Sequence, residues 1–486
     1  MAQDLAITAD RDRTLELATF FTTLKLDDLP ENVVRHAKAS ILNSIGCGLS
    51  ASSMEPHKYM LAALDIASKQ SLGGMFSAAT ILGRSEHASV EDAAMLNGLA
   101  MTARFFDDTH LSTVVHPSGA PLAALLAYAE ANHLSGDDVI LAFVVGVETM
   151  LAIATALSLE PYKRGWHTTG ITSTFGATAA IAKIMKLSPI EFAHALGHAS
   201  SMASGTRGVF GTETLSMHAG RAAQNGLLAA KMAKAGLRST THALEKWVKL
   251  ISHDNGDLAA ITALADTNAK DRKWLILENA FKPYPCGIVV HPAIDADLAA
   301  HEYFFADPSS PLFGKSPQEA HEHFSSIEAR VTPLTVKLCG VRHPTGEVQS
   351  IFSTYHGIAI GLLYGKAGIR EFGNDVIKEP SIRGLRDLIQ LFTDDTLADD
   401  QASLTITYND VAGVATEKRF TVEHATGSLQ NPMSEKQLEE KFMDQASIGG
   451  IKHEAAQQAL KDLWDLEAVE DVGSIMKHLV PGPDPR

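Results

Sequence analysis

The feature that most constrains the fold of this chain is a long succession of helical patterns, from residue 14 to about residue 275. In the segment 30–45 apolar side chains recur at helical spacing, and Pro30 suits the first turn of a helix. Alanine and glycine dominate several of these segments, namely 119–132, 172–185 and 219–236. Because small side chains let neighbouring helices approach closely, the sequence predicts a compact layer built of helices.

One helical segment is apolar enough to resemble a membrane span. It covers residues 139–157 (VILAFVVGVETMLAIATAL), which is close to the length that crosses a bilayer. It contains Glu148 and many small residues, and Asp137 and Asp138 at its start suit the N-terminus of a helix. A buried core helix is therefore predicted. Glu148 is either a buried acid available for chemistry or a carboxylate satisfied by a neighbouring helix end.

The charge balance limits the possible partners. The 486 residues include 41 Lys and Arg against 57 Asp and Glu, a formal net charge of −16 with His neutral. This excess of acid argues against binding to nucleic acid or to an anionic membrane surface. Residues 1–21 have no basic stretch before an apolar one, so no secretory signal is expected. Three scattered cysteines suit a reducing compartment, and a cytoplasmic protein is predicted.

The pattern changes near residue 276, where strand-like segments appear. Segment 326–341 alternates as a strand does, and 403–410 and 417–427 form a second alternating pair that predicts a hairpin. A helical stretch, 352–365, lies between them. The predicted organisation is a helical domain over 1–275, an α+β domain over 276–427, and C-terminal helices over 428–486.

Three segments place a histidine beside small or hydroxyl residues at the start of a helical run. They are HPSGA (116–120), WHTTG (166–170) and MHAGR (217–221). Unpaired N–H groups and the positive end of the helix dipole make such places natural sites for a carboxylate, and a histidine there can act as acid, base or donor. The alternative is that the hydroxyl residues only cap helices and that each histidine is an ordinary loop residue.

The run FFDDTH (105–110) stands just before His116. Paired aspartates beside two histidines suit either a metal site or the positioning of a histidine. No HExxH or CxxC motif accompanies them, so we predict that they cap a turn and orient neighbouring donors without a metal. The sequence also contains no glycine-rich phosphate loop and no dinucleotide fingerprint.

A loop stiffened by two prolines, KPYPCG, begins at Lys282, between the two predicted domains. Lys282 and Tyr284 on this rigid segment suit a clamp for a substrate, although a plain domain linker explains the prolines equally well. Arg221, Arg104 and Arg207 are further candidates for binding a carboxylate, since a guanidinium can donate two hydrogen bonds to it. Each of these arginines alone is more often part of a surface ion pair.

Taken in order, several segments resemble the MmgE/PrpD family, and the resemblance covers nearly the whole chain. The segments are LNSIGCGLSA (42–51), AMLNGLAMTARFFDDTHLSTVVHPSG (94–119), GVETM (146–150), RGWHTTGITSTFGATAAIAKIMKLS (164–188), FGTETLSMHAGRAAQNGLLAA (210–230), KPYPCGIVVHPAIDA (282–296) and GSLQNPMSEKQLEEKF (427–442). The resemblance implies a mainly α fold, in which both chain ends form a large helical domain and a smaller α+β lid is inserted. It also implies a homodimer and a cofactor-free pocket between the domains for a small polycarboxylate.

The resemblance further implies a set of site residues. Asp108, Thr109, His116, His167 and Lys282 match active-site positions of the family. The predicted catalytic residues are His116, His167, Asp108 and Lys282, with no metal. The predicted substrate-binding residues are Thr109, Ser118, Thr168, His218, Arg221, Tyr284 and His356.

Four positions depart from the family pattern. Phe105 stands where the family usually has an acidic residue, and Leu215 stands where it usually has a lysine. His356 falls on a tyrosine position, with Tyr355 adjacent, and Gly287 falls on a histidine position. Losing the lysine removes a fixed cation that would hold a carboxylate, and Leu and Phe make the pocket smaller and drier. The substrate is therefore predicted to have fewer carboxylates or an alkyl chain.

Three hypotheses about function follow. The first is a lyase that removes water, or alternatively carbon dioxide, from a citrate-like or aconitate-like acid, with His116 and His167 as acid and base. The second is an epimerase or isomerase that needs only reversible proton transfer at one carbon. The third is a catalytically altered family member that acts as a binding subunit. Retention of His116, His167 and Lys282 favours the catalytic hypotheses.

Overall fold

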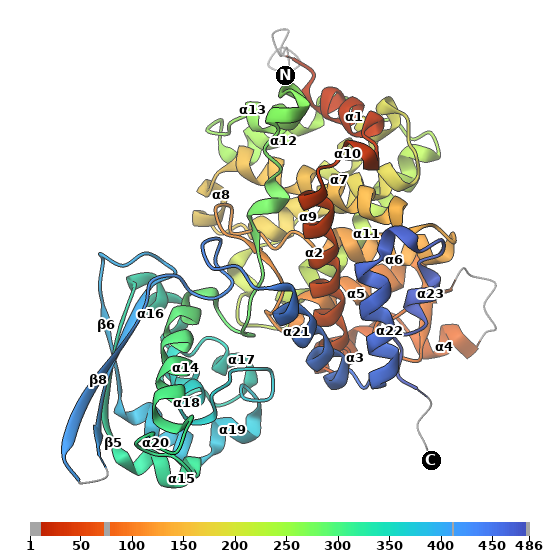
Figure 1. Cartoon of the computed structure of the whole chain (residues 1–486). Coiled ribbons are helices and arrows are strands. Elements are labelled where there is room, and N and C mark those ends of the chain that lie inside the picture. Colours follow the sequence, from red (N-terminus) through yellow and green to blue (C-terminus); the bar gives the residue numbers. More distant parts are fainter. Residues whose placement is uncertain (1–10, 72–77, 411–412, 483–486) are drawn as a thin grey trace. The chain divides into compact units, whose positions relative to one another are not determined.

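The computed structural model describes residues 11–71, 78–410 and 413–482 (Figure 1). The prediction that no secretory signal is present concerns residues 1–21, of which residues 1–10 lie outside the described residues. The chain is mainly α and divides into two compact units. The first unit comprises residues 1–103, 107–279 and 435–486, and the second comprises residues 104–106 and 280–434. Both chain ends thus contribute to the first unit, and the second is an insertion.

The first unit is built almost entirely of helices. Its N-terminal part contains α1 (Arg13–Thr23), α2 (Glu31–Ala51), α3 (Glu55–Ala63), α4 (Ile66–Ser71), β1 (Ala78–Thr80), β2 (His87–Ser89), α5 (Val90–Ala103), β3 (Thr109–His110), α6 (Gly119–Ala131), α7 (Gly136–Leu157), α8 (Glu160–Lys163), α9 (Thr168–Ile184), α10 (Pro189–Ser200), α11 (Thr214–Lys234), α12 (Ala243–Ser252), α13 (Ala259–Asp266) and the 3₁₀ turn η4 (Leu275–Glu278). Its C-terminal part contains α21 (Glu435–Ile448), α22 (His453–Trp464) and α23 (Gly473–Met476). The strands β1 and β2 form a short antiparallel pair.

Small residues determine the packing of the central helices of this unit. Helix α5 packs against α11, and α9 packs against both α7 and α11. A Cβ added to Gly98 of α5 would lie 2.9 Å from the Cα of Gly220 of α11. A Cβ added to Gly146 of α7 would lie 2.8 Å from the carbonyl oxygen of Gly176 of α9. Such distances leave no room for a methyl group, so the predicted close approach of the helices is confirmed.

The apolar segment 139–157 lies in α7, which is long and apolar enough to cross a membrane. In this fold, however, 89% of its most apolar window is buried inside the protein. The hydroxyl of Ser135 caps its first turn by accepting the N–H of Asp138. The prediction of a buried core helix is therefore confirmed.

The second unit is a four-stranded sheet with helices. The strands are β5 (Phe324–Val331), β6 (Ile389–Thr393), β7 (Ala402–Asn409) and β8 (Ala415–Val422), in the order β6-β5-β7-β8, with β5 and β6 parallel and the other pairs antiparallel. The helices are α14 (His291–Phe305), α15 (Pro317–Ala320), α16 (Pro333–Cys339), α17 (Glu347–Ser350), α18 (Thr354–Tyr364), α19 (Asn374–Lys378) and α20 (Pro380–Leu388). Figure 1 shows α14, α18 and α20 on one side of this sheet. The predicted hairpin of β7 and β8 is confirmed.

The strand predicted over 326–341 is wrong in its second half. Strand β5 ends at Val331, and α16 follows at once. The hydroxyl of Thr332 accepts the N–H of Thr335 at 3.3 Å, and Pro333 occupies the first helical position. This capping arrangement starts a helix and prevails over the alternating apolar pattern.

A buried carboxyl group in the second unit leads to a prediction about stability. Asp297 of α14 has 0% exposure, and neither of its carboxyl oxygens has a hydrogen-bond partner among the described residues. Burial raises the pKa of Asp297 well above its usual range. The folded protein therefore binds this proton more tightly than the unfolded chain, so the contribution of Asp297 to stability falls as pH rises above the usual pKa of an aspartate.

We expect Asp297→Asn to raise the free energy of unfolding of the second unit at pH 7 by about 1–3 kcal/mol, because the neutral amide avoids the cost of the carboxylate. The gain should shrink as pH falls through about 4, the usual pKa of an aspartate, because Asp297 is protonated in both states only below that pH. Calorimetry between pH 4 and pH 8 measures this difference in the free energy of unfolding between the variant and the wild type. Asp395→Asn, at an exposed residue, is the control. A gain that does not change with pH would contradict the prediction.

Candidate active site

The first part of the candidate site is the loop that leads into α6. Asp108 in this loop has 0% exposure, and its Oδ2 accepts hydrogen bonds from the Ser118 hydroxyl and the Asn279 side-chain amide. Its Oδ1 has no partner within the described part of the chain. Burial raises the pKa of Asp108 to about 6, although the two hydrogen bonds act in the opposite direction. Asp108 therefore holds the loop against the first residues of α6 and against Asn279.

The backbone of this loop orients the ring of His116. The Nδ1 of His116 lies 2.8 Å from the carbonyl oxygen of Asp108, which can only accept, so Nδ1 carries the hydrogen. In the neutral ring Nε2 is then the basic nitrogen. The Thr109 hydroxyl and the Asp107 carboxylate lie 3.2 and 3.4 Å from the same Nδ1, and the carboxylate is placed to stabilise a positive charge on the ring. The backbone N–H of His116 donates to the Thr169 hydroxyl of α9 at 3.1 Å.

The other two histidines of the candidate site, His167 and His218, lie against each other. The Nδ1 atoms of His167 and His218 are 2.8 Å apart, so a single proton lies between them and one ring donates it to the other. When both rings are neutral, one therefore has a free Nε2 lone pair and the other has an Nε2–H donor. Burial, together with the nearby His218 and His116, holds the pKa of His167 well below its usual range. The pair is thus neutral around pH 7, so it can accept a proton at one Nε2 and donate a hydrogen bond from the other Nε2–H.

The N-terminus of α9 lies beside these histidines, because His167 is its N-cap residue. The first N–H groups of an α-helix have no partner within the helix, and they attract an anion. Thr168 has 0% exposure, and its hydroxyl has no hydrogen-bond partner among the residues that the structure describes. Gly170 allows a close approach here, since a Cβ on it would lie 3.2 Å from the Cα of Gly205. The arrangement suits a carboxylate.

In the second unit, Lys282 contacts the backbone of Phe105. Lys282 is 4% exposed, and its ammonium group donates to the carbonyl of Phe105 at 2.9 Å. Phe105 has a positive φ of 55°, and its ring packs edge-on against Phe352 with 5.5 Å between ring centres. Phe105 therefore anchors its segment to the core of the second unit. The predicted catalytic role of Lys282 remains a prediction.

Two predicted substrate-binding residues of the second unit make contacts within that unit. The hydroxyl of Tyr284 donates to the carboxylate of Asp295. His356 has 0% exposure, its Nε2 donates to the carbonyl of Glu371 at 3.0 Å, and its Nδ1 lies 3.3 Å from the Arg386 guanidinium. Burial lowers the pKa of His356 to about 4. These contacts hold both side chains within the second unit, and their predicted role in substrate binding remains a prediction.

The arginine and cysteine side chains that could bind or attack a substrate are either bonded to other residues or buried. Arg221 is exposed, and its guanidinium donates to Gln224 at 2.6 Å. All three cysteines are free and buried, and burial raises the pKa of the Cys286 thiol, which argues against a nucleophilic role. Among the described residues, Asp12, His242 and Glu245 form one group that could hold a metal ion. None of these three residues is a predicted active-site residue.

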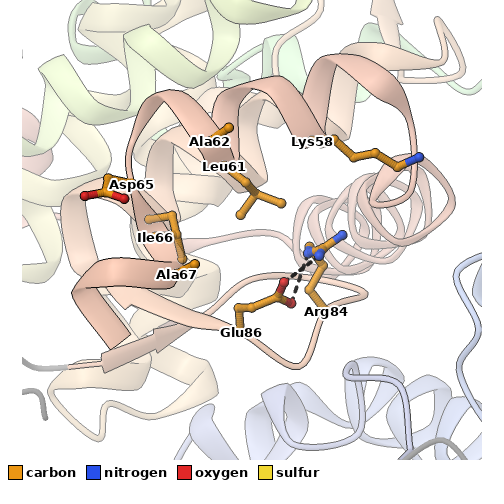
Figure 2. Close-up of a pocket in the computed structure, with 8 residues that line it drawn as sticks. All are labelled: Lys58, Leu61, Ala62, Asp65, Ile66, Ala67, Arg84 and Glu86. Carbon is orange, nitrogen blue, oxygen red and sulfur yellow. Dashed lines mark hydrogen bonds and ion pairs between the residues drawn. The ribbon is translucent and has the colours of Figure 1, made fainter. Parts of the chain in front are cut away.

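A separate cavity of about 240 Å³ lies at α3 and α4 in the first unit (Figure 2). The residues that line it are Lys58, Leu61, Ala62, Asp65, Ile66, Ala67, Arg84 and Glu86. The guanidinium of Arg84 binds the carboxylate of Glu86, which neutralises both charges. No predicted site residue is among these lining residues, so we place the candidate site at the histidines.

Several residues of the site were not predicted from the sequence. Asn279 bonds to Asp108 from 171 positions away, and no local motif marks it. Thr169 has the local pattern of a helix cap, but its hydroxyl accepts the N–H of His116. The one available signal was that Asn279 lies just before the Lys-Pro loop.

Comparison with known proteins identifies the family. Residues 15–255 match the MmgE/PrpD N-terminal domain, and residues 284–466 match the MmgE/PrpD C-terminal domain. The chain therefore belongs to the MmgE/PrpD family, as its motifs indicate.

Similar proteins cover almost the same length. The chain is 27% identical to cis-aconitate decarboxylase of Homo sapiens, over 97% of this chain and 95% of that protein. It is 26% identical to the Mus musculus protein of the same name, over 95% and 91% of the two chains. It is 23% identical to cis-aconitate decarboxylase of Aspergillus terreus, over 96% and 95%.

Proposed function

We propose that this protein is a lyase that removes carbon dioxide or water from a small aconitate-like or citrate-like acid, without a cofactor. The observation that carries the proposal is the cluster of His116, His167 and His218 at the N-terminus of α9, beside the unpartnered hydroxyl of Thr168. Full-length similarity to cis-aconitate decarboxylases supports the class of substrate. The packing of Phe105 and the apolar Leu215 support a substrate with an alkyl group or fewer carboxylates.

In the proposed complex one carboxylate of the substrate binds the free N–H groups of α9 and the hydroxyl of Thr168. These donors would also stabilise the negative charge that develops when a bond to the neighbouring carbon breaks. The reacting carbon would lie near Nε2 of His116, whose orientation is fixed by the carbonyl of Asp108. The buried His167 and the N-terminus of α9 would limit the access of water to this charge.

Decarboxylation requires a proton donor. The bond between carbon and the departing carboxylate breaks, its electron pair moves into the carbon skeleton, and protonated His116 delivers its Nε2 proton to carbon. Dehydration uses the same residues in another order. Neutral His116 removes a proton from carbon and then delivers it to the leaving hydroxyl, which departs as water, while the Nε2–H of the pair formed by His167 and His218 donates a hydrogen bond to the leaving oxygen.

The proposal is tested by incubating the purified protein with cis-aconitate, citrate, 2-methylcitrate, alkylcitrates and iminodisuccinate. We expect mass spectrometry to show loss of carbon dioxide or water from at least one of them, and absorbance to follow the alkene. A parallel incubation in deuterated water is the control for the alternative chemistry. Deuterium in recovered substrate or its stereoisomer, without a change in the alkene, would show an epimerase. Absence of any reaction would overturn the proposal of an enzyme for this class of substrate.

A further inference from the structure

A second buried carboxylate lies in the middle of α7. Glu148 is 2% exposed, and its two oxygens accept the backbone N–H groups of Leu275 and Ile276 at 3.2 and 2.8 Å. These are the first two residues of η4, so the carboxylate binds the N-terminus of this turn. Burial raises the pKa of Glu148 to about 7, while the two N–H groups act in the opposite direction. Of the two alternatives for Glu148, the structure therefore shows the second: its carboxylate accepts hydrogen bonds from the end of a neighbouring helical turn.

The other end of η4 points to the candidate active site. Asn279 directly follows the turn, and its side-chain amide donates to Asp108. Glu278, the last residue of η4, has its carboxylate 3.6 Å from Nε2 of His110. Asp108 in turn presents the carbonyl that holds the ring of His116. A turn of four residues thus joins the carboxylate of Glu148 to the loop that orients His116.

We propose that Glu148 is a positioning residue of the active site, which acts through η4 and Asn279 on Asp108 and thereby on His116. The role of Glu148 in catalysis rests on the proposed function. Its effect on the position of the His116 ring does not. Glu148 is suited to this role because it holds two successive N–H groups, which fixes both the place and the direction of so short a turn. Each of these contacts lies within the first unit, and Glu148, Asn279 and Asp108 are buried, with 2%, 2% and 0% exposure.

The test uses Glu148→Gln, Asn279→Ala and the double variant. Glutamine has one acceptor oxygen, so its amide nitrogen faces an N–H group and η4 must shift. We expect Glu148→Gln to lower kcat about tenfold with little change in KM, because misplacement of a catalytic group affects the chemical step. The double variant should be no slower than Asn279→Ala alone, since both changes act through the same contact. Independent, multiplying effects would overturn the proposal.

Glu245 supplies a matched control. It is 5% exposed, and its two oxygens accept the backbone N–H and the hydroxyl of Thr14 at 2.8 and 2.6 Å. Glu245→Gln therefore removes a buried carboxylate with similar contacts that leads to α1 instead of the active site. We expect this variant to lose stability to a similar degree and to keep its kcat. A loss of kcat equal to that of Glu148→Gln would show a general effect of instability and would overturn the proposal.

A readout without substrate separates this inference from the proposed function. The imidazole resonances of His116, observed by NMR in the free protein, report the position of the ring. We expect Glu148→Gln and Asn279→Ala to shift them in the same direction and Glu245→Gln to leave them in place. If Glu148→Gln does not fold, Glu148→Asp replaces it, since a shortened carboxylate cannot hold both N–H groups. Unchanged resonances in the folded variant would overturn the inference, even if a substrate is found.

Discussion

His116→Gln is expected to lower kcat/KM by about 10²–10⁴-fold, the range for loss of a general acid or base. Glutamine retains a polar side chain with an N–H donor, although its amide nitrogen lies one bond further from Cβ than the Nδ1 of His116 does. It has no group that takes up and releases a proton near neutral pH, and the chemical step should therefore fail. The measurement is steady-state kinetics on the substrate that the panel identifies, together with a thermal unfolding curve.

His133→Gln is the control for this substitution. The side chain of His133 is 79% exposed and pairs with Asp471 at the surface of the first unit. Its replacement should leave kcat/KM unchanged. If His116→Gln keeps wild-type activity in a folded protein, the assignment of His116 as the acid or base is wrong, and the pair of His167 and His218 becomes the alternative.

Asp108→Ala is expected to lower the free energy of unfolding of the first unit by about 2–4 kcal/mol, because it leaves two buried donors unpaired. The donors are the hydroxyl of Ser118 and the amide of Asn279, which both bond to Oδ2. Activity should fall with stability, since the carbonyl of this residue orients His116. Denaturant unfolding and kinetics on the same preparations measure the two effects.

Asp108→Asn is the matched variant, because an amide oxygen can still accept from both donors. It also removes the titration of a carboxyl group whose pKa burial raises to about 6. In the wild type the contribution of Asp108 to stability declines as pH rises from about 4 to 6, because the folded state binds the proton more tightly than the unfolded chain. This decline should be absent in Asp108→Asn. An equal loss of stability in both variants would show that the hydrogen bonds do not account for the effect.

Much of the fold follows from local patterns in the sequence. The core helix α7 and the hairpin of β7 and β8 have regular spacing of apolar residues and recognisable ends, and both are confirmed. Helix α16 was missed because its apolar residues alternate as in a strand, and only the cap at Thr332 and Pro333 reveals a helix. Local spacing therefore predicts an element well when its ends are also considered.

The candidate site is less accessible to such reasoning. His116, His167 and His218 stand out because each lies beside small or hydroxyl residues, and the structure brings them together at α9. The prediction that His218 precedes a helix is wrong, because α11 begins at Thr214. The contacts of His356 with Glu371 and Arg386 join residues that are distant in the sequence, so no local pattern shows them. Asn279 contributes only through a distant contact, so its role becomes visible only in three dimensions.

The construction of the first unit from both chain ends has a consequence for biosynthesis. Helix α2 packs against α21, and Lys441 donates to the buried side chain of Asn43, 398 residues earlier in the sequence. At a typical rate of about 5–20 residues per second, the ribosome needs roughly 20–80 s to make the residues between them. During that time the apolar side of α2 lacks its native neighbour and is open to wrong contacts. Premature termination before α21 leaves this surface exposed permanently, so truncated chains should aggregate and be degraded instead of folding.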